Sequence, residues 1–402
     1  MIETSRRAFL KATGVAMPLL ARSAATSKKI LGYVGTYSSP QGPEGSKGRG
    51  QGIYLFELDT VTGILSQRDV FADASNPAWL AFNPARTHLY AANETATYER
   101  ASSGSVSAFA IDRSNGKLTL VNTVSSEGAG PAHLSIHPSR RYVLVANYAG
   151  GTIAVLPVGS NGELGRPTDV KRDQGEPGAA KASSAPPGSF AISGHDRPHA
   201  HMIQSDPSGR FVLSSDLALD QIFVWRFDAD SGTLSPNDPP AIRLPSGDGP
   251  RHFTFHPNGR LLYSLQEEAS TIVTFDWDAK KGAAVAKQTI STLPEGFAGT
   301  NFTSEIKISV DSRFLYAANR LHDTIARFSI GAGGKLGYLG EEWTRGDYPR
   351  SFNTDPSGEF LFTCNQRSDA IAAFRVNRNT GALAFTGRYT AVGTPAIIIF
   401  LT

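Results

Sequence analysis

The sequence predicts an all-β chain that closes into a seven-bladed β-propeller with four-stranded antiparallel blades. The first observation behind this prediction is a short apolar segment that alternates, or nearly alternates, as the third strand of a blade does. A glycine-containing turn follows every copy, and glycine supplies the positive φ that tight hairpins need. The seven segments are 53–58, 106–111, 153–158, 222–227, 272–277, 325–330 and 371–376.

A second repeating signal lies upstream of six of these segments. It is a turn such as 206–210, which reads Asp-Pro-Ser-Gly-Arg. A short apolar strand lies before each turn and another lies after it, so one unit comprises four antiparallel strands in roughly 45–70 residues, as in a propeller blade. The anchor positions of the six turns are Pro84, Pro138, Pro207, Pro257, Val310 and Pro356.

The seventh unit is split between the two ends of the sequence. Residues 31–35 enter a blade that lacks its inner strand, and residues 395–400 are the best candidate for that strand. Pairing the two ends would close the ring and remove open sheet edges, which promote aggregation. Residues 169–197 interrupt the repeat, because they are rich in Gly, Pro, Ala, Ser and charge without alternation. We interpret them as a long loop inserted between two blades.

Composition excludes several classes of function. The 402 residues contain 39 Lys and Arg against 36 Asp and Glu, and the first 25 residues account for the whole excess of positive charge. The rest offers no clustered basic surface for nucleic acid. Cys364 is the only cysteine, which excludes an internal disulfide. No stretch after residue 25 approaches the roughly 18 apolar residues of a membrane span. Dinucleotide and phosphate-loop fingerprints are absent, and we expect no cofactor.

The N-terminal segment has the features of an export signal. Residues 4–11 read Thr-Ser-Arg-Arg-Ala-Phe-Leu-Lys, a modest apolar run extends to Leu20, and small residues follow at 23–25. This resembles the consensus of twin-arginine (Tat) signals. We therefore predict a Tat-type signal peptide at 1–25, recognised by the Tat export machinery. Residues 26–402 would then form a propeller outside the cytoplasm, either periplasmic or secreted.

Blade geometry brings two kinds of position to one mouth of the central channel. They lie five or six residues before each anchor and about ten residues after it. The position nine after the anchor is always an amide or Asp, which favours a turn role in backbone hydrogen bonding. The other positions differ between blades, as a single ligand requires and a repeated fold does not. They form a mixed ring of His133, His201, Arg251, His252, Glu305, Arg350, Glu94, Glu267 and Arg320. Two interpretations stay open, namely substrate binding and salt bridges between blades.

Five short motifs occur in order along residues 30–400. They are Tyr-Val-Gly-Thr-Tyr at 33–37, Pro-His-Ala-His at 198–201, Gly-Pro-Arg-His-Phe at 249–253, Ser-Glu-Ile at 304–306 and Phe-Leu-Tyr-Ala-Ala-Asn-Arg at 314–320. Together they resemble the seven-bladed lactonase family of 6-phosphogluconolactonases, which also includes carboxy-muconate lactonising enzymes. The resemblance implies lactone chemistry at the central channel, on a small-molecule lactone or organic anion, without a metal. Its His, Arg and Glu positions correspond to His201 (or His199), Arg251 and Glu267.

These residues suggest roles in lactone hydrolysis, which needs an activated water, a stabilised oxyanion and a proton for the leaving alkoxide. We predict that Glu267 or His201 acts as the general base and that Arg251 stabilises the oxyanion or binds an anion. We expect a further set of residues to bind the substrate: His199, His252, Glu305, Arg320 and Arg350. A His-x-His pair can bind metal, but no third ligand at diagnostic spacing accompanies His199 and His201, so a metal-free polar role is favoured.

Two other functions compete with hydrolysis. A cycloisomerase would form a lactone from a muconate-like diacid, with paired arginines holding the two carboxylates. A non-catalytic propeller with surface-layer-type repeats would bind protein or glycan. Such repeats usually keep the mouth positions alike, whereas here they differ.

Overall fold

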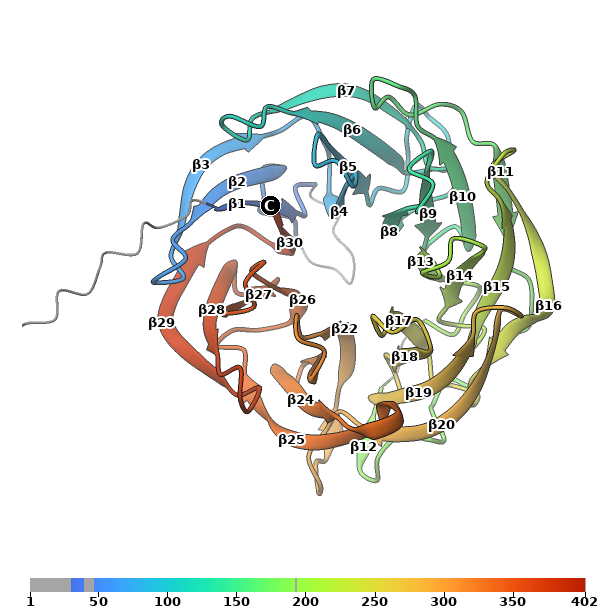
Figure 1. Cartoon of the computed structure of the whole chain (residues 1–402), viewed down its shortest axis with the longest axis vertical. Coiled ribbons are helices and arrows are strands. Elements are labelled where there is room, and N and C mark those ends of the chain that lie inside the picture. Colours follow the sequence, from blue (N-terminus) through green and yellow to red (C-terminus); the bar gives the residue numbers. More distant parts are fainter. Residues whose placement is uncertain (1–29, 40–46, 192–193, 402) are drawn as a thin grey trace, which may run out of the picture.

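The computed structural model describes residues 30–39, 47–191 and 194–401. The predicted signal peptide at 1–25 lies outside these residues. Seven four-stranded antiparallel sheets are arranged as blades around a central axis, which confirms the predicted fold (Figure 1). Within the described ranges no helix has the length and apolar character needed to cross a bilayer.

The strands of each blade are given from the channel outward. Blade 1 contains β30 (Pro395–Leu401), β1 (Ile30–Thr36), β2 (Ile53–Leu58) and β3 (Leu65–Phe71). Blade 2 contains β4 (Pro77–Phe82), β5 (His88–Asn93), β6 (Ser105–Ile111) and β7 (Leu118–Ser125). Blade 3 contains β8 (Pro131–Ile136), β9 (Tyr142–Asn147), β10 (Thr152–Pro157) and β11 (Asp169–Arg172). Blade 4 contains β13 (Ala200–Ser205), β14 (Phe211–Asp216), β15 (Gln221–Asp228) and β16 (Thr233–Arg243).

The remaining blades follow the same plan. Blade 5 contains β17 (Pro250–Phe255), β18 (Leu261–Gln266), β19 (Thr271–Asp278) and β20 (Ala283–Ser291). Blade 6 contains β22 (Phe302–Ile308), β23 (Phe314–Arg320), β24 (Thr324–Ile330) and β25 (Leu336–Trp343), with a short 3-10 turn, η2 (Ala332–Gly334), before β25. Blade 7 contains β26 (Pro349–Thr354), β27 (Phe360–Asn365), β28 (Ala370–Val376) and β29 (Leu383–Ala391).

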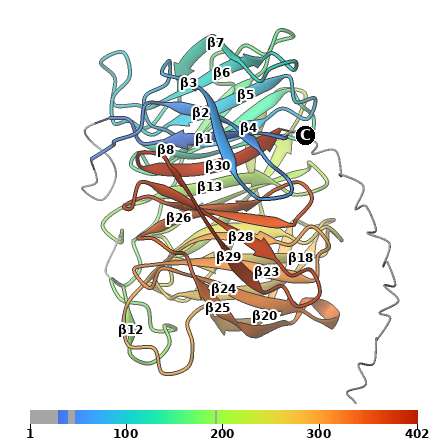
Figure 2. The same cartoon turned by 90° about the vertical axis from the view of Figure 1, so that its left-hand side faces the viewer.

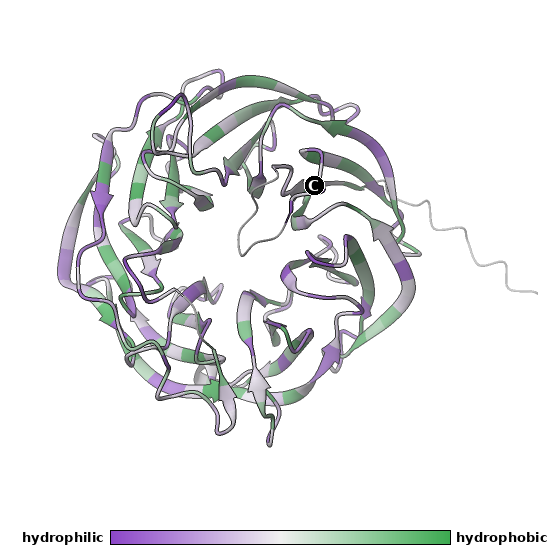
Figure 3. Ribbon diagram, turned by 180° about the vertical axis from the view of Figure 1, so that it is seen from behind, coloured by the Kyte–Doolittle hydropathy of each residue, from purple (hydrophilic) through white to green (hydrophobic). Residues whose placement is uncertain are grey.

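The two ends of the chain close the ring within blade 1. Strand β1 pairs antiparallel with β30, from Leu31 opposite Leu401 to Gly35 opposite Ile397. Ile398 is fully buried and packs in a cluster with residues of blades 1 and 7. Cys364 lies in the same cluster as a buried free thiol. Apolar faces of neighbouring blades therefore pack together, while hydrophilic residues recur along the outer strands and turns (Figure 3).

The predicted loop at 169–197 is shorter than expected, because its first four residues form strand β11 on the outer edge of blade 3. Later in the segment, β12 (Ser189–Phe190) pairs in parallel with β21 (Gly299–Thr300), which precedes blade 6. The inserted segment, defined here as the described residues 173–191 and 194–198, thus reaches from blade 3 to the connection between blades 5 and 6. It projects from one face of the disc (Figure 2).

Every inner strand contains a register shift near its first residues. In each blade, one residue of the inner strand has no partner on the second strand, which is the definition of a β-bulge. A bulge redirects a side chain away from the regular alternation of the sheet. The bulged positions are Ala78, Ala132, His201, Arg251, Arg350, Ala396 and, in blade 6, one of Ser304 and Glu305.

Candidate active site

The carboxylate of Glu267 lies between two arginines. Arg251 projects from the bulge of β17, Glu267 follows the end of β18, and Arg320 ends β23. Arg251 Nε and Arg320 Nη2 each lie 2.8 Å from Glu267 Oε2. All three side chains are buried. One carboxylate oxygen therefore holds two guanidinium groups from neighbouring blades in fixed positions.

A third arginine joins the ring from blade 7. Arg350 Nη2 lies 3.3 Å from Glu94 Oε2, and the Tyr37 hydroxyl donates a 2.7 Å hydrogen bond to the same oxygen. The Arg350 guanidinium also lies over the Tyr37 ring, 5.1 Å from its centroid. Three arginines thus gather around the two carboxylates of Glu267 and Glu94. Guanidinium groups clustered in a buried setting favour binding of an anionic group.

His201 occupies the bulge of β13 and is 5% exposed. Its Nδ1 has no hydrogen-bond partner among the described residues. Burial, reinforced by the nearby charge of Arg251, lowers the pKa of His201 well below its usual range. The ring is therefore a neutral imidazole at pH 7, surrounded by cations.

His252 connects the arginine cluster to Glu305. Its Nε2 lies 3.3 Å from Arg251 Nη1, and its Nδ1 lies 3.3 Å from Glu305 Oε1. Burial first, and then Arg251, lower the pKa of His252 to about 4. Burial alone would raise the pKa of Glu305, but Lys307 and His252 outweigh it and lower that pKa to about 2. At neutral pH the pair is thus an uncharged imidazole beside an ionised carboxylate.

His199 is placed differently from the other predicted residues. Its Nδ1 lies 3.0 Å from the Tyr148 carbonyl oxygen, and its Nε2 lies 2.8 Å from Asp196 Oδ1. The ring stacks on Tyr148 at a centroid distance of 4.2 Å. Both nitrogens are engaged within the fold, so His199 supports the segment that leads to His201 and offers no free nitrogen to a ligand.

The structure therefore brings most of the predicted residues into one network. Arg251, Glu267 and Arg320 are in direct contact, and His201 and His252 adjoin them, with ring centroids 5.1 Å apart. The salt-bridge interpretation describes part of this network, since Arg320 and Glu267 join two blades. It leaves unexplained the buried nitrogen of His201 that has no hydrogen-bond partner among the described residues.

Sequence reasoning missed the aromatic supports of the arginines. The Tyr348 hydroxyl accepts a 3.1 Å hydrogen bond from Arg320 Nη1, and the guanidinium lies 5.0 Å from the Tyr348 ring centroid. The ring of Tyr37 likewise lies against the guanidinium of Arg350. Tyr37 lies in the first of the five motifs, and Tyr348 lies two residues before Arg350, so both stood next to positions already identified.

The inserted segment is anchored beside this network by His195. The imidazole is 1% exposed, with Nδ1 2.8 Å from Glu268 Oε2 and Nε2 3.3 Å from Asp220 Oδ1. Asp220 also accepts hydrogen bonds from the backbone N–H groups of Gly247 and Gly249, just before Arg251. Burial opposes protonation, but Asp220 and Glu268 outweigh it and raise the pKa of His195 to about 9. His195 is thus an imidazolium that bridges the segments carrying Arg251 and Glu267.

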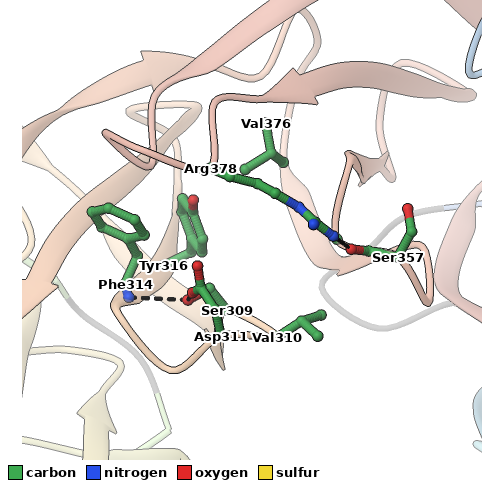
Figure 4. Close-up of a pocket in the computed structure, with 9 residues that line it drawn as sticks. Ser309, Val310, Asp311, Phe314, Tyr316, Ser357, Val376 and Arg378 are labelled. Atoms are coloured by element: carbon green, nitrogen blue, oxygen red, sulfur yellow. Dashed lines mark hydrogen bonds between the residues drawn. The ribbon is translucent and has the colours of Figure 1, made fainter.

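A cavity also lies on the face of the propeller opposite the arginines, and it is a weaker candidate for a functional site. It has a volume of about 190 Å³ and lies between blades 6 and 7 (Figure 4). The Arg378 guanidinium donates to the Ser357 carbonyl oxygen, and Ser309 is hydrogen-bonded to Asp311 and to the Phe314 backbone. These groups satisfy one another, and we assign the cavity to the packing of adjacent blades.

Comparison with known proteins identifies the family of this chain. A family model described as "Lactonase, 7-bladed beta-propeller" matches residues 31–400. The chain belongs to this lactonase family. It is 31% identical to a protein of Bacillus subtilis named 6-phosphogluconolactonase, over 93% of this chain and 99% of that one. A Formosa agariphila protein with the same name is 30% identical, over 83% and 91% of the two chains.

Among solved structures, the periplasmic gluconolactonase of Pseudomonas aeruginosa has the same architecture. It superposes with a TM-score of 0.82 at 27% identity, over 93% of this chain and 99% of that one. This lactonase-family enzyme therefore matches its relatives over almost the whole propeller.

Replacing His195 with Gln should lower the melting temperature by about 5 °C at pH 6, because two buried carboxylates lose their cation at a cost of about 3 kcal/mol. A group whose pKa rises on folding stabilises the fold fully below its unfolded pKa of about 6.5 and loses that effect as pH passes its folded pKa. The difference in melting temperature should therefore shrink between pH 6.5 and about 9.

The matched control is His322→Gln, which removes a half-buried histidine 2.7 Å from Glu341. We expect a small change there. A His195→Gln difference that stays constant from pH 6 to pH 10 would contradict the imidazolium assignment.

Proposed function

We propose that the protein hydrolyses the lactone of a polyhydroxy acid at the channel mouth, between His201 and the three arginines. The observation that carries this proposal is the arrangement of three buried guanidinium groups that share two carboxylates beside a neutral imidazole. The names of the Bacillus subtilis and Pseudomonas aeruginosa relatives support a sugar lactone as the substrate class.

In the first step, His201 removes a proton from a water molecule as its oxygen bonds to the lactone carbonyl carbon. The electron pair of the carbonyl double bond moves to the carbonyl oxygen. Arg251 would stabilise that oxyanion, since its guanidinium is already held in position and needs little reorganisation. Arg320 and Arg350 would orient the substrate through its anionic or hydroxyl groups.

In the second step, the electron pair of the oxyanion re-forms the carbonyl double bond as the ring carbon–oxygen bond breaks, and the pair of the broken bond stays on the leaving oxygen. His201 returns its proton to this alkoxide, which gives a hydroxy acid as the only product. Burial first, and then the neighbouring arginines, lower the pKa of His201, so its imidazolium gives up the proton readily. We assign the base to His201 and not to Glu267, because Glu267 Oε2 is already bound by two guanidinium groups.

We further propose that this hydrolysis uses no metal ion. His201 is the side chain at the channel mouth best suited to coordinate a metal ion. The positive charges of Arg251, Arg350 and Arg320 act on this histidine. A divalent cation placed there would be repelled by all three. Dialysis against a chelator should therefore leave the rate unchanged, and loss of activity restored by a metal would overturn this part of the proposal.

Arg251→Ala should lower kcat/KM for δ-gluconolactone by about 10²–10³, the usual effect of removing one oxyanion donor. His201→Asn should lower kcat more than it raises KM. Initial rates at neutral pH, corrected for spontaneous hydrolysis, measure both effects. Arg68→Ala provides a control, because Arg68 lies half-exposed on an outer strand and pairs with Glu57.

The same assay should include 6-phosphogluconolactone and carboxy-muconate. Turnover of either lactone supports hydrolysis. Lactone formation from carboxy-muconate alone would support the cycloisomerase, in which the arginines hold two carboxylates. Unchanged kcat/KM in the Arg251 and His201 variants, with both variants folded, would contradict the proposed site.

We also propose that residues 1–25 direct folded protein out of the cytoplasm through the twin-arginine pathway. The support is the sequence of residues 4–11. Fusing residues 1–30 to a reporter that is exported only in the folded state should place the reporter outside the cytoplasm, and changing Arg6 and Arg7 to Lys should retain it. Export that is indifferent to both arginines would overturn this proposal.

A further inference from the structure

A second cavity lies in the channel, beyond His252 as seen from the arginines. Its volume is about 370 Å³, within the usual range for small-molecule sites. It follows the inner strands β17 and β22 as far as the turns at Pro257 and Val310, and Val310 is 62% exposed at the far face. Arg251, Arg320 and Arg350 do not line it. The cavity is therefore separate from the arginine cluster.

The wall of this cavity contains a carboxylate oxygen without a hydrogen bond. Glu305 is 3% exposed, and its Oε1 lies 3.3 Å from His252 Nδ1 and accepts a 3.0 Å hydrogen bond from the Ile306 backbone. Its Oε2 accepts no hydrogen bond from the described residues and lies 3.8 Å from Lys307 Nζ. A buried acceptor left unsatisfied is costly, so a donor is expected to come from the cavity itself.

The remaining wall combines an aromatic surface with neutral polar groups. The Trp79 ring lies 4.5 Å from His133 and 5.2 Å from His252, measured between centroids, and Lys307 Nζ lies 5.9 Å from its centroid. Burial lowers the pKa of His133 well below its usual range, so this imidazole is uncharged. The charges of Glu305 and Lys307 cancel, and Gln204 adds an amide to the wall.

We propose that this cavity is a second binding site, which takes a neutral polyhydroxylated compound such as a sugar or polyol. Hydroxyl groups would donate to Glu305 Oε2, and the C–H face of the compound would contact Trp79. An anion would be repelled by the ionised Glu305, and a cation would compete with Lys307 for it. This cavity thus favours a different class of ligand from the cluster of Arg251, Arg320 and Arg350, which favours anions.

The test measures binding of D-glucose and D-glucitol to the mature protein by saturation-transfer NMR and calorimetry. We expect dissociation constants of about 1–10 mM, as for small ligands held by a few contacts. Glu305→Gln should weaken this binding at least tenfold, because a charged acceptor is lost. Arg350→Gln is the matched control, since Arg350 does not line the cavity, and polyol binding should be unchanged.

Gluconate provides the opposite pattern, with binding weakened more by Arg350→Gln than by Glu305→Gln. If Glu305→Gln fails to fold, Gln204→Ala replaces it, because Gln204 lines the same cavity without supporting His252. The proposal is overturned if neither polyol binds, if polyol binding depends on Arg350, or if it is unaffected by the cavity variants. None of these results bears on lactone turnover, which is measured separately.

Discussion

The shared carboxylate of Glu267 is the interaction on which the mouth of this propeller depends. Burying a guanidinium group is costly unless a partner compensates its charge, and breaking one buried pair typically costs about 3–5 kcal/mol. Glu267 compensates Arg251 and Arg320 together, at 2.8 Å from each. Because these residues come from blades 5 and 6, the pair fixes the relative position of two blades at the place where an anion would bind.

This arrangement is possible because the ring is closed and its inner strands are bulged. Closure through β1 and β30 fixes the circumference, so the bulged residues of all blades converge on one mouth. Small residues occupy the bulge in blades 2 and 3, whereas His201, Arg251 and Arg350 occupy it in blades 4, 5 and 7. The same β-bulge thus places small residues on one side of the channel and ionisable residues on the other.

The inserted segment adds a further constraint on the chemical side. His195 joins Asp220 and Glu268, and these residues hold the backbone next to Arg251 and Glu267. A loop that differs from the repeat therefore lies beside the blades whose bulges carry charge. The polar groups of the channel divide at His252, with arginines on one side and the Glu305 cavity on the other.

Much of this architecture could be predicted from the sequence, because alternation and turn glycines recur with each blade. All seven predicted third strands are the third strands of their sheets, and the N- and C-terminal strands pair as expected. Strand β11 was missed because Asp169–Arg172 is polar and half-exposed, and so lacks an apolar pattern. The bulges were missed because their effect on side-chain direction comes from the pairing of two strands and leaves no periodic signal.

The site was predictable only as a set of positions. Spacing from the anchor identified Arg251, Glu267 and Arg320, since divergence between blades is visible in the sequence. It gave no information on partners, such as Asp196 and the Tyr148 carbonyl oxygen, which contact the two ring nitrogens of His199. The supports from Tyr37 and Tyr348 depend on side-chain packing across blades, which spacing along the chain does not reveal.

A crystal structure of the protein with gluconate, the hydrolysis product of gluconolactone, tests the proposed site most directly. We expect a gluconate carboxylate oxygen about 3 Å from the Arg251 guanidinium, with Glu267 still bound to Arg320. Gluconate bound at the opposite end of the channel, or bound without contact to any of the three arginines, would contradict it.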